Sequence, residues 1–130
     1  MSYEIVFEDG GHGVVITFAG SVSGKEILAA NVEMYGGDKQ NLLHYQIWDF
    51  SEADSIGMDE ESIRDAALQD RQAAADNPDQ IIAIIGTEDF FAGIDKRFAI
   101  YTEVWSGFST RTFLVMSEAR KWVEFSLVDR

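Results

Sequence analysis

The stretch QIIAIIG, residues 80–86, decides the fold class of this chain. Its apolar residues occupy consecutive positions, so in a strand they point to both faces rather than to one. A strand that is apolar on both faces is typical of a sheet covered by helices on two sides. The stretch therefore predicts a central strand of an α/β protein.

The residues before this strand predict a helix over about 60–76. Asp59 has the right position to cap the helix, and the first turn holds two acids, which the positive end of the helix dipole favours. Asn77-Pro78 ends it, because proline cannot continue a helix. The apolar run LLHYQIWDF (42–50) is the preceding strand. The predicted core face of the helix is thin and rich in alanine: Ile63, Ala66, Ala67 and Ala74.

The N-terminal part of the chain predicts a hairpin followed by a helix. YEIVFED (3–9) alternates apolar and polar residues, and VVITFAG (14–20) is rich in β-branched residues. The short glycine turn GGHG (10–13) between them implies antiparallel pairing. Ser23, followed three residues later by Glu26, has capping-box spacing and predicts a helix over 24–35. Its expected apolar stripe is Leu28, Val32 and Tyr35.

Another helix, strand and helix follow the central strand. From about Phe90 to Gly107, apolar residues recur at spacings of three and four, the strongest helical signal in the chain. TRTFLVM (110–116) predicts the last strand, and Ser117 is expected to cap the helix EARKWVEFSL. The predicted order is β-β-α-β-α-β-α-β-α, a single-domain α/β sandwich over residues 1–130. Its sheet is expected to be mostly parallel, with an antiparallel first strand.

Composition and charge exclude several classes of function. The chain has 23 acids against 10 bases, a formal charge of −13, so nucleic acids and anionic membranes are expected to be repelled. The absence of cysteine excludes disulfides and thiolate chemistry. The sequence shows neither a signal peptide nor an apolar run long enough to span a membrane. We therefore expect a cytoplasmic protein whose acidic surface either keeps it soluble or meets a basic partner.

Three stretches carry a resemblance to a known family. They are VFEDGGHGVVITFAG (6–20), YQIWDFSEAD (45–54) and TRTFLVMSEARKWVEF (110–125). With this order of elements, the chain resembles the SpoIIAA-like group of the STAS-like fold family and its Sec14-like neighbours. Better-known members are anti-sigma factor antagonists, in which a kinase phosphorylates the second serine of an Asp-Ser-Ser-Gly-like turn. The corresponding string here is Asp54-Ser55-Ile56-Gly57, and Ile56 has no hydroxyl to phosphorylate.

The resemblance implies a partner surface at the loop and helix start over residues 51–62. We expect a non-enzymatic regulatory or binding module that acts through protein–protein contact, with its acids facing a basic patch. Ser55 is expected to be a hydroxyl in a turn, and an alternative is that Asp59 permanently supplies the negative charge of a phosphoserine. The residues expected to bind the partner are Ser51, Asp54, Ser55, Asp59, Glu60, Glu61 and Ser62.

The Sec14-like neighbours imply an alternative function, because they enclose lipids between helices and sheet. The chain would then carry an apolar small molecule or lipid in a pocket beneath the 91–107 helix. The same aromatic stripe can instead be core, or the face of a homodimer. The residues expected to line the pocket are Phe91, Ile94, Phe98, Tyr101 and Trp105.

No sequence motif predicts catalysis or a cofactor. His12 and His44 have no partner at a metal-ligand spacing, and no nucleophile elbow or phosphate-binding loop is present. Counted from Asp49, the acids depart from the calcium-loop pattern, because position five is Ala53 and position six, where the loop needs glycine, is Asp54. We therefore expect no enzyme, no metal and no cofactor.

Overall fold

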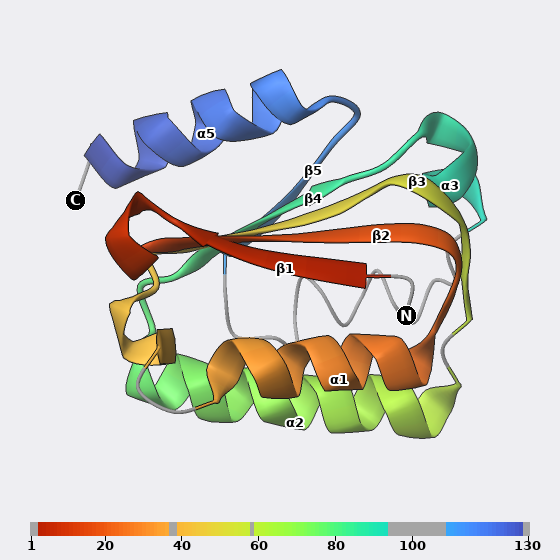
Figure 1. Ribbon diagram of the computed structural model, residues 1–130, viewed down its shortest axis with the longest axis horizontal. Helices are drawn as coiled ribbons and strands as arrows, with labels where there is room; N and C mark the ends of the chain where they lie inside the picture. Colours follow the sequence, from red (N-terminus) through yellow and green to blue (C-terminus); the bar gives the residue numbers. More distant parts are fainter. Residues whose placement is uncertain (1–2, 37–38, 58, 94–108, 129–130) are drawn as a thin grey trace.

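A computed structural model describes residues 3–36, 39–57, 59–93 and 109–128. Five strands form one sheet, with α1 and α2 on one face and α5 on the other (Figure 1). The strands are β1 (Tyr3–Glu8), β2 (Gly13–Ser23), β3 (Tyr45–Gly57), β4 (Ile81–Ile85) and β5 (Ser109–Phe113). The α-helices are α1 (Gly24–Tyr35), α2 (Glu60–Asp76), α3 (Glu88–Ala92) and α5 (Met116–Val128). Two 3-10 turns are η1 (Asp9–Gly11) and η2 (Lys39–Leu42).

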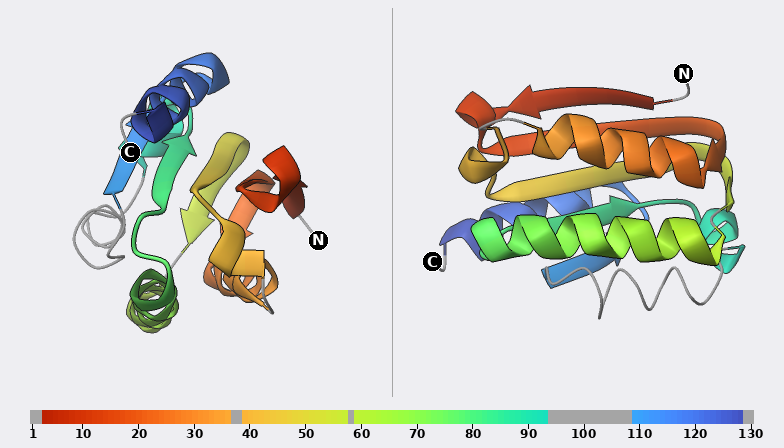
Figure 2. Two further views of the ribbon diagram at one scale, coloured as in Figure 1. Left: turned by 90° about the vertical axis from the view of Figure 1, so that its left-hand side faces the viewer. Right: turned by 90° about the horizontal axis from the view of Figure 1, so that it is seen from below.

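The sheet topology confirms the predicted fold class. The strands lie in the order β1-β2-β3-β4-β5, with β1 antiparallel to β2 and the other pairs parallel. Every residue of β4, Ile81–Ile85, is buried, as expected of a strand covered on both faces. Figure 2 shows the resulting layers, with the sheet between the α1–α2 pair and α5.

Each face of the sheet has its own apolar core. On the α1–α2 face, the rings of Phe18, Phe50 and Phe90 stack in a row, with centroids 4.7 Å and 5.0 Å apart. On the other face, α5 packs Ala119 and Val123 against the sheet. The aromatic row joins β2, β3 and α3 and therefore fixes the position of the short helix.

Side-chain caps begin three of the helices. Ser23 and Glu26 form the predicted capping box of α1. Asp59 accepts a hydrogen bond from the Ser62 backbone N–H at 2.8 Å, which confirms it as the cap of α2. Thr87 accepts from Phe90 in the same way and begins α3. These caps hold because they depend only on residues three positions apart.

Several expected boundaries were wrong. β3 begins at Tyr45 and continues to Gly57, beyond the predicted end at Phe50. α3 begins at Glu88 and ends at Ala92, so the predicted helix to Gly107 is not continuous, and residues 94–108 lie outside the described part of the chain. β5 ends at Phe113 and α5 begins at Met116, which places Ser117 inside the first turn rather than at the cap.

The expected core face of α1 was also wrong in part. Val32 is 62% exposed, whereas Leu28 and Tyr35 are only half-buried. The buried residues of α1 lie one position earlier on the helix: Gly24, Ile27, Ala30, Asn31 and Met34. For α2, Ile63, Ala66 and Ala67 are buried as predicted and Ala74 is half-buried. A polar Asn31 and a polar Asp70 in these faces were not foreseen.

A chain of hydrogen bonds satisfies most polar groups buried under α1 and α2. Gln46 donates to Gln80 Oε1 at 2.9 Å and to the Tyr35 hydroxyl at 3.1 Å. Trp48 donates to Gln46 Oε1 at 2.9 Å, and Tyr35 donates to Asp70 Oδ1 at 2.7 Å. Burial, followed by the nearby Asp70 carboxylate, raises the pKa of Tyr35 well above its usual value.

Candidate functional site

The predicted partner surface lies on an extension of β3 rather than in a loop. β4 pairs only with Tyr45–Asp49, whereas β2 accompanies β3 as far as the pair Ser23 and Gly57. The two strands therefore continue beyond the part of β3 that pairs with β4, and they bend toward the starts of α1 and α2 on the right-hand side of Figure 1. We call Phe50–Gly57 the β3 overhang. Most of the residues expected in a loop are thus held in a two-stranded ribbon.

Two irregularities bend the β3 overhang. Between the pairs Thr17–Asp49 and Ala19–Glu52, β3 contains one residue more than β2. The same happens between the pairs Gly20–Ala53 and Ser21–Ser55. Extra residues of this kind are β-bulges, which break the regular alternation of a strand and re-aim its side chains. The bulges explain why neighbouring residues of the overhang are exposed together.

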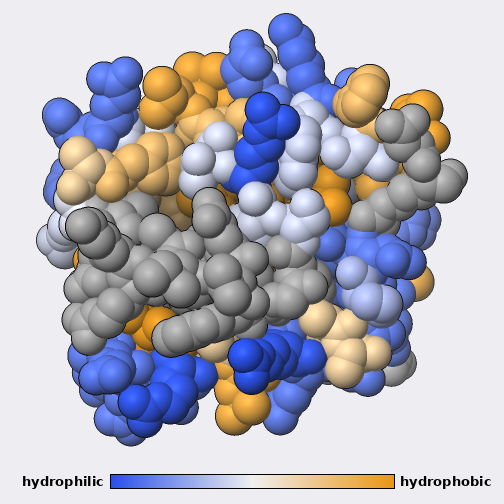
Figure 3. Space-filling view, turned by 180° about the vertical axis from the view of Figure 1, so that it is seen from behind, coloured by the Kyte–Doolittle hydropathy of each residue, from blue (hydrophilic) through white to orange (hydrophobic). Residues whose placement is uncertain are grey.

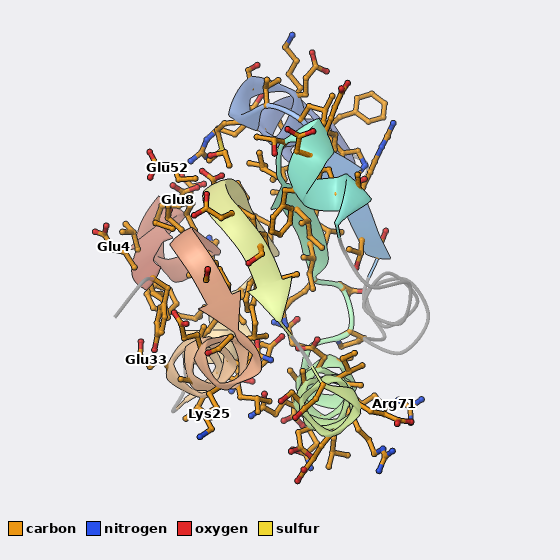
Figure 4. The ribbon with its side chains drawn as sticks, turned by 90° about the vertical axis from the view of Figure 1, so that its right-hand side faces the viewer. Glu4, Glu8, Lys25, Glu33, Glu52 and Arg71 are labelled. Carbon is orange, nitrogen blue, oxygen red and sulfur yellow. The ribbon has the colours of Figure 1, made fainter. Side chains whose placement is uncertain are left out.

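The side chains of the β3 overhang divide into exposed polar and buried apolar groups. The backbone N–H of Ser51 donates to Asp49 Oδ1 at 2.9 Å. Ala53 is buried and Ile56 packs partly against the core, which anchors the ribbon. The exposed residues are Ser51, Glu52, Asp54, Ser55 and Gly57. Figure 4 shows Glu52 at the periphery of the molecule, on the side of the sheet away from α1 and α2.

Ser55 lies in a strand, paired with Ser21, and the expectation of a hydroxyl in a turn was wrong. The two bulges and the pairing with β2 carry the strand through the stretch that resembles the phosphorylated turn. Ser55 is exposed, but it precedes the cap of α2 by four residues and is not part of the first helical turn. The serine nearest the helix start is Ser62.

The start of α2 is tied to the start of α1. A Cβ atom on Gly24 would lie 2.6 Å from Ser62 Oγ and 2.7 Å from Ser62 Cβ, so only glycine allows this approach. Ser62 is half-buried as a result. Glu60 Oε1 lies 3.6 Å from Arg64 Nη2 in an exposed ion pair between residues one helical turn apart. Of the residues expected to bind a partner, Asp59 and Ser62 therefore have structural roles.

The segment from Asp49 to Glu61 is strongly acidic. Residues 49–61 contain six acids and no base. Glu52 and Asp54 project from the ribbon, and Glu61 is exposed in the first turn of α2. The end of β3 and the starts of α1 and α2 lie at the same end of the molecule (Figure 1).

The alternative apolar pocket is described only at one residue. Phe91 borders a hollow of about 350 Å³ between α3, β5 and the start of α5. Ile94, Phe98, Tyr101 and Trp105 lie outside the described residues, so their expected role stays a prediction. The other lining residues are Arg111, Thr112, Phe113, Leu114, Val115 and Glu118. Figure 3 shows apolar and hydrophilic side chains interspersed along the upper edge of this side of the molecule.

A polar cluster at the hairpin end was missed by the sequence analysis. The Tyr45 hydroxyl donates to Glu8 Oε1 at 2.6 Å, and Arg120 donates to both Glu8 oxygens at 2.8 Å and 3.2 Å. The Arg120 hydrogen bond lowers the pKa of Glu8, and burial together with Asp9 and Glu8 raises the pKa of Tyr45. Glu8 and Arg120 are 112 residues apart, so no local pattern could reveal the pair.

The two histidines lie against each other. Their rings stack with centroids 4.5 Å apart and planes 9° apart. The backbone N–H of His44 also donates to the backbone carbonyl of His12 at 2.7 Å. Across residues 3–36, 39–57, 59–93 and 109–128, no group of three or more His, Cys, Asp or Glu residues is arranged to hold a metal ion. Within the same ranges, no helix has the length and apolar character needed to cross a membrane.

Comparison with known proteins supports the fold. No known protein-family profile and no curated protein sequence matches the chain. Among solved structures, it is similar to an uncharacterized protein from the DUF3478 family with a SpoIIAA-like fold, from Shewanella loihica PV-4. The two share 16% sequence identity with a TM-score of 0.50, and the match covers 94% of this chain and 92% of the other.

The chain has a SpoIIAA-like fold. Its antiparallel hairpin, parallel strands and C-terminal helix are the elements that the sequence predicted. At this sequence identity the similarity concerns the fold alone, and a shared fold does not imply a shared function.

Proposed function

We propose that this SpoIIAA-like chain is a non-enzymatic regulatory or binding module that contacts a basic protein partner. The contact surface consists of the β3 overhang and the first turn of α2, residues 50–62. The observation that carries the proposal is the projection of β3 past β4, which presents acids on an exposed ribbon.

Charge complementarity supports a basic partner rather than a nucleic acid or an anionic membrane. Like charges across an interface are unfavourable, whereas opposite charges speed the encounter and select the partner. Glu52, Asp54 and Glu61 are exposed in this surface, and residues 49–61 contain no base. The association should therefore slow steeply as salt is added.

Charge reversal tests the proposal. We expect the variant Glu52→Lys/Asp54→Lys/Glu61→Lys to lose a basic protein that cross-links to, and co-purifies with, the wild-type chain from its own cells. Asp59 is left unchanged, because its replacement would remove the cap of α2.

A matched control separates this surface from net charge. The variant Glu4→Lys/Glu118→Lys/Glu124→Lys changes the net charge equally but alters exposed residues of β1 and α5. It should retain the partner. Equal loss in both variants, or retention in both, would show that the β3 overhang is not the contact surface.

Carriage of an apolar small molecule or lipid is the second candidate function. The hollow beside Phe91 favours it, because Phe113, Leu114 and Val115 provide apolar lining. Native mass spectrometry of freshly purified protein should then detect bound apolar mass. The variant Phe113→Asp should lose that mass while keeping its fold, and a wild-type protein that stays empty after incubation with fatty acid would contradict this candidate.

A further inference from the structure

A second hollow lies between the C-terminal parts of α1 and α2, away from the β3 overhang. Its volume is about 350 Å³, within the range of small-molecule sites. Helices α1 and α2 lie side by side and run in the same direction, so both end at this side of the molecule (Figure 2). The described residues that line it are Asn31, Val32, Tyr35, Gly36, Gln69, Gln72, Ala73 and Asp76. We call this hollow the C-terminal groove.

The helix ends give the C-terminal groove a negative potential. The last carbonyl groups of a helix carry a partial negative charge, and two parallel helices add their charges at the same place. Proteins often compensate such an end with Lys, Arg or His in the last turn. Neither α1 nor α2 has a basic residue in its last turn.

Asp76 adds a full negative charge where it is locally unfavourable. It is the last residue of α2, so its exposed carboxylate faces the negative end of the helix dipole. None of the described residues that line the groove is a base. Arg71, on the same helix, points away from α1 in Figure 4. An acid that contradicts local preference marks a position where function is expected.

Asn31 contributes a polar atom without a partner. Its side chain is 1% exposed, and its Nδ2 donates to Gln69 Oε1 at 3.0 Å. Its Oδ1 is buried and accepts no hydrogen bond. A buried carbonyl oxygen of this kind is unfavourable unless a donor reaches it. Asn31 and Gln69 both line the groove, where Gln69 is half-buried.

We propose that the C-terminal groove binds a small organic cation, an ammonium or guanidinium group on a short apolar chain. The cationic group lies near Asp76 and the last carbonyls of the helices, and one N–H donates to Asn31 Oδ1. The apolar part of the ligand packs on Val32 and Ala73. The groove lies outside the surface assigned to the protein partner, so the two proposals stand or fall separately.

A titration followed by two-dimensional ¹H–¹⁵N NMR tests this proposal, with 1,4-diaminobutane as the probe. We expect the side-chain amide signals of Asn31, Gln69 and Gln72 to shift at millimolar concentration and physiological ionic strength. The neutral analogue 1,4-butanediol has the same length and should leave them unchanged. Equal shifts with both compounds, or none with the diamine, would overturn the proposal.

Variants identify the groups responsible. Asp76→Asn should weaken binding about threefold, as expected for one exposed ion pair. Asn31→Leu should weaken binding at least about tenfold, because it removes the buried acceptor. Its thermal midpoint should change little, because the variant loses the hydrogen bond to Gln69 Oε1 but also loses the buried oxygen that has no donor. A large loss of stability with unchanged binding would mean that Asn31 is purely structural and would reject the site.

Two controls address the general acidity of the chain. Asp65→Asn removes an exposed carboxylate from the same helix but not from the groove, and it should leave binding unchanged. A loss equal to that of Asp76→Asn would reveal non-specific attraction.

Lys39 is the base that follows α1 most closely in the sequence. If Lys39→Ala binds the probe more tightly than the wild type, the chain fills the groove with its own lysine and the proposal fails.

Discussion

The two ends of the α1–α2 helix pair place acidic side chains in opposite electrostatic surroundings. At the N-terminal end, Glu26 belongs to a capping box, Asp59 caps α2, and Glu61 lies in a first turn that favours acids. At the C-terminal end, Asp76 meets a negative helix end without a base, and Asn31 has an oxygen without a partner. The acids of the first end stabilise the helices on which they lie, whereas Asp76 lies where the helix dipole disfavours an acid.

This difference shows why a count of acids is weak evidence for a binding surface. At the N-terminal end, Asp59 and Glu60 have local explanations, since one caps α2 and the other pairs with Arg64. Glu52 and Asp54 have no such explanation, because they project from the β3 overhang. These two acids are therefore the main support for a protein partner.

The largest expected effect comes from the contact that holds the two helix starts together. Gly24→Ala should destabilise the fold by about 2 kcal/mol, because its Cβ would overlap Ser62. Urea denaturation measures the loss. The double variant Gly24→Ala/Ser62→Gly should recover much of it, since the clash is then relieved. A single variant as stable as the wild type would show that the helix starts are not in close contact.

The cap of α2 should have the next largest effect. Asp59→Ala should lower the free energy of unfolding by about 1 kcal/mol, because the Ser62 N–H loses its acceptor. Asp59→Asn keeps an oxygen that can cap the helix and should cost only a few tenths of a kcal/mol. If both variants were equally destabilised, the charge of Asp59 rather than its capping bond would be the main contribution.

Glu8 is an acid that does have a base, and it provides a pH-dependent reference for Asp76. Arg120 lowers the pKa of Glu8 in the folded state. The pair therefore stabilises the fold above the unfolded pKa of Glu8, and this stability is lost as the pH falls through the lower folded pKa. Because Arg120 is 43% exposed, the effect should be only about 0.5 kcal/mol.

The measurement compares the wild type with Glu8→Gln, which keeps an acceptor for Tyr45. Chemical denaturation at neutral and acidic pH should show the wild type as the more stable protein at neutral pH only. A difference that is the same at both pH values would mean that the Glu8–Arg120 ion pair contributes nothing.

The smallest effects have opposite signs at the two helix ends. Asp76→Asn should raise the stability by a few tenths of a kcal/mol, because it removes a charge from the negative helix end. Glu61→Gln should lower it by a similar amount at the positive end of the same helix. Thermal melts should show both changes shrinking as salt is added. Equal signs would contradict the proposed difference between the ends.

Much of the fold could be predicted because its signals are local. The capping residues Ser23 and Asp59 act on backbone groups three positions away. The apolar run 81–85 can be recognised as a buried strand without knowing which segments pack on it. The face of α1 was harder, because a helix with apolar residues on several sides can turn either side toward the sheet. Packing against the sheet selected the side with Met34 and left Val32 exposed.

The candidate sites were predicted less well. Residues 51–62 were singled out from their charge and from a resemblance, but the strand that runs through Ser55 depends on pairing with β2. Serine, glycine and aspartate are common in turns, so local preference favoured a loop there. The C-terminal groove had a local signal, the acid at the end of α2, but the burial of Asn31 depends on another helix.

By itself, the sequence determined the order of strands and helices, the caps of α1 and α2 and the acidic character of the chain, because each of these depends on neighbouring residues or on composition. Only the tertiary structure decided how far β3 extends, which acids remain exposed and where a buried oxygen lacks a donor. Those features depend on contacts between segments far apart in the chain. Glu8 and Arg120, or Gly24 and Ser62, become neighbours only when the sheet and its helices have assembled.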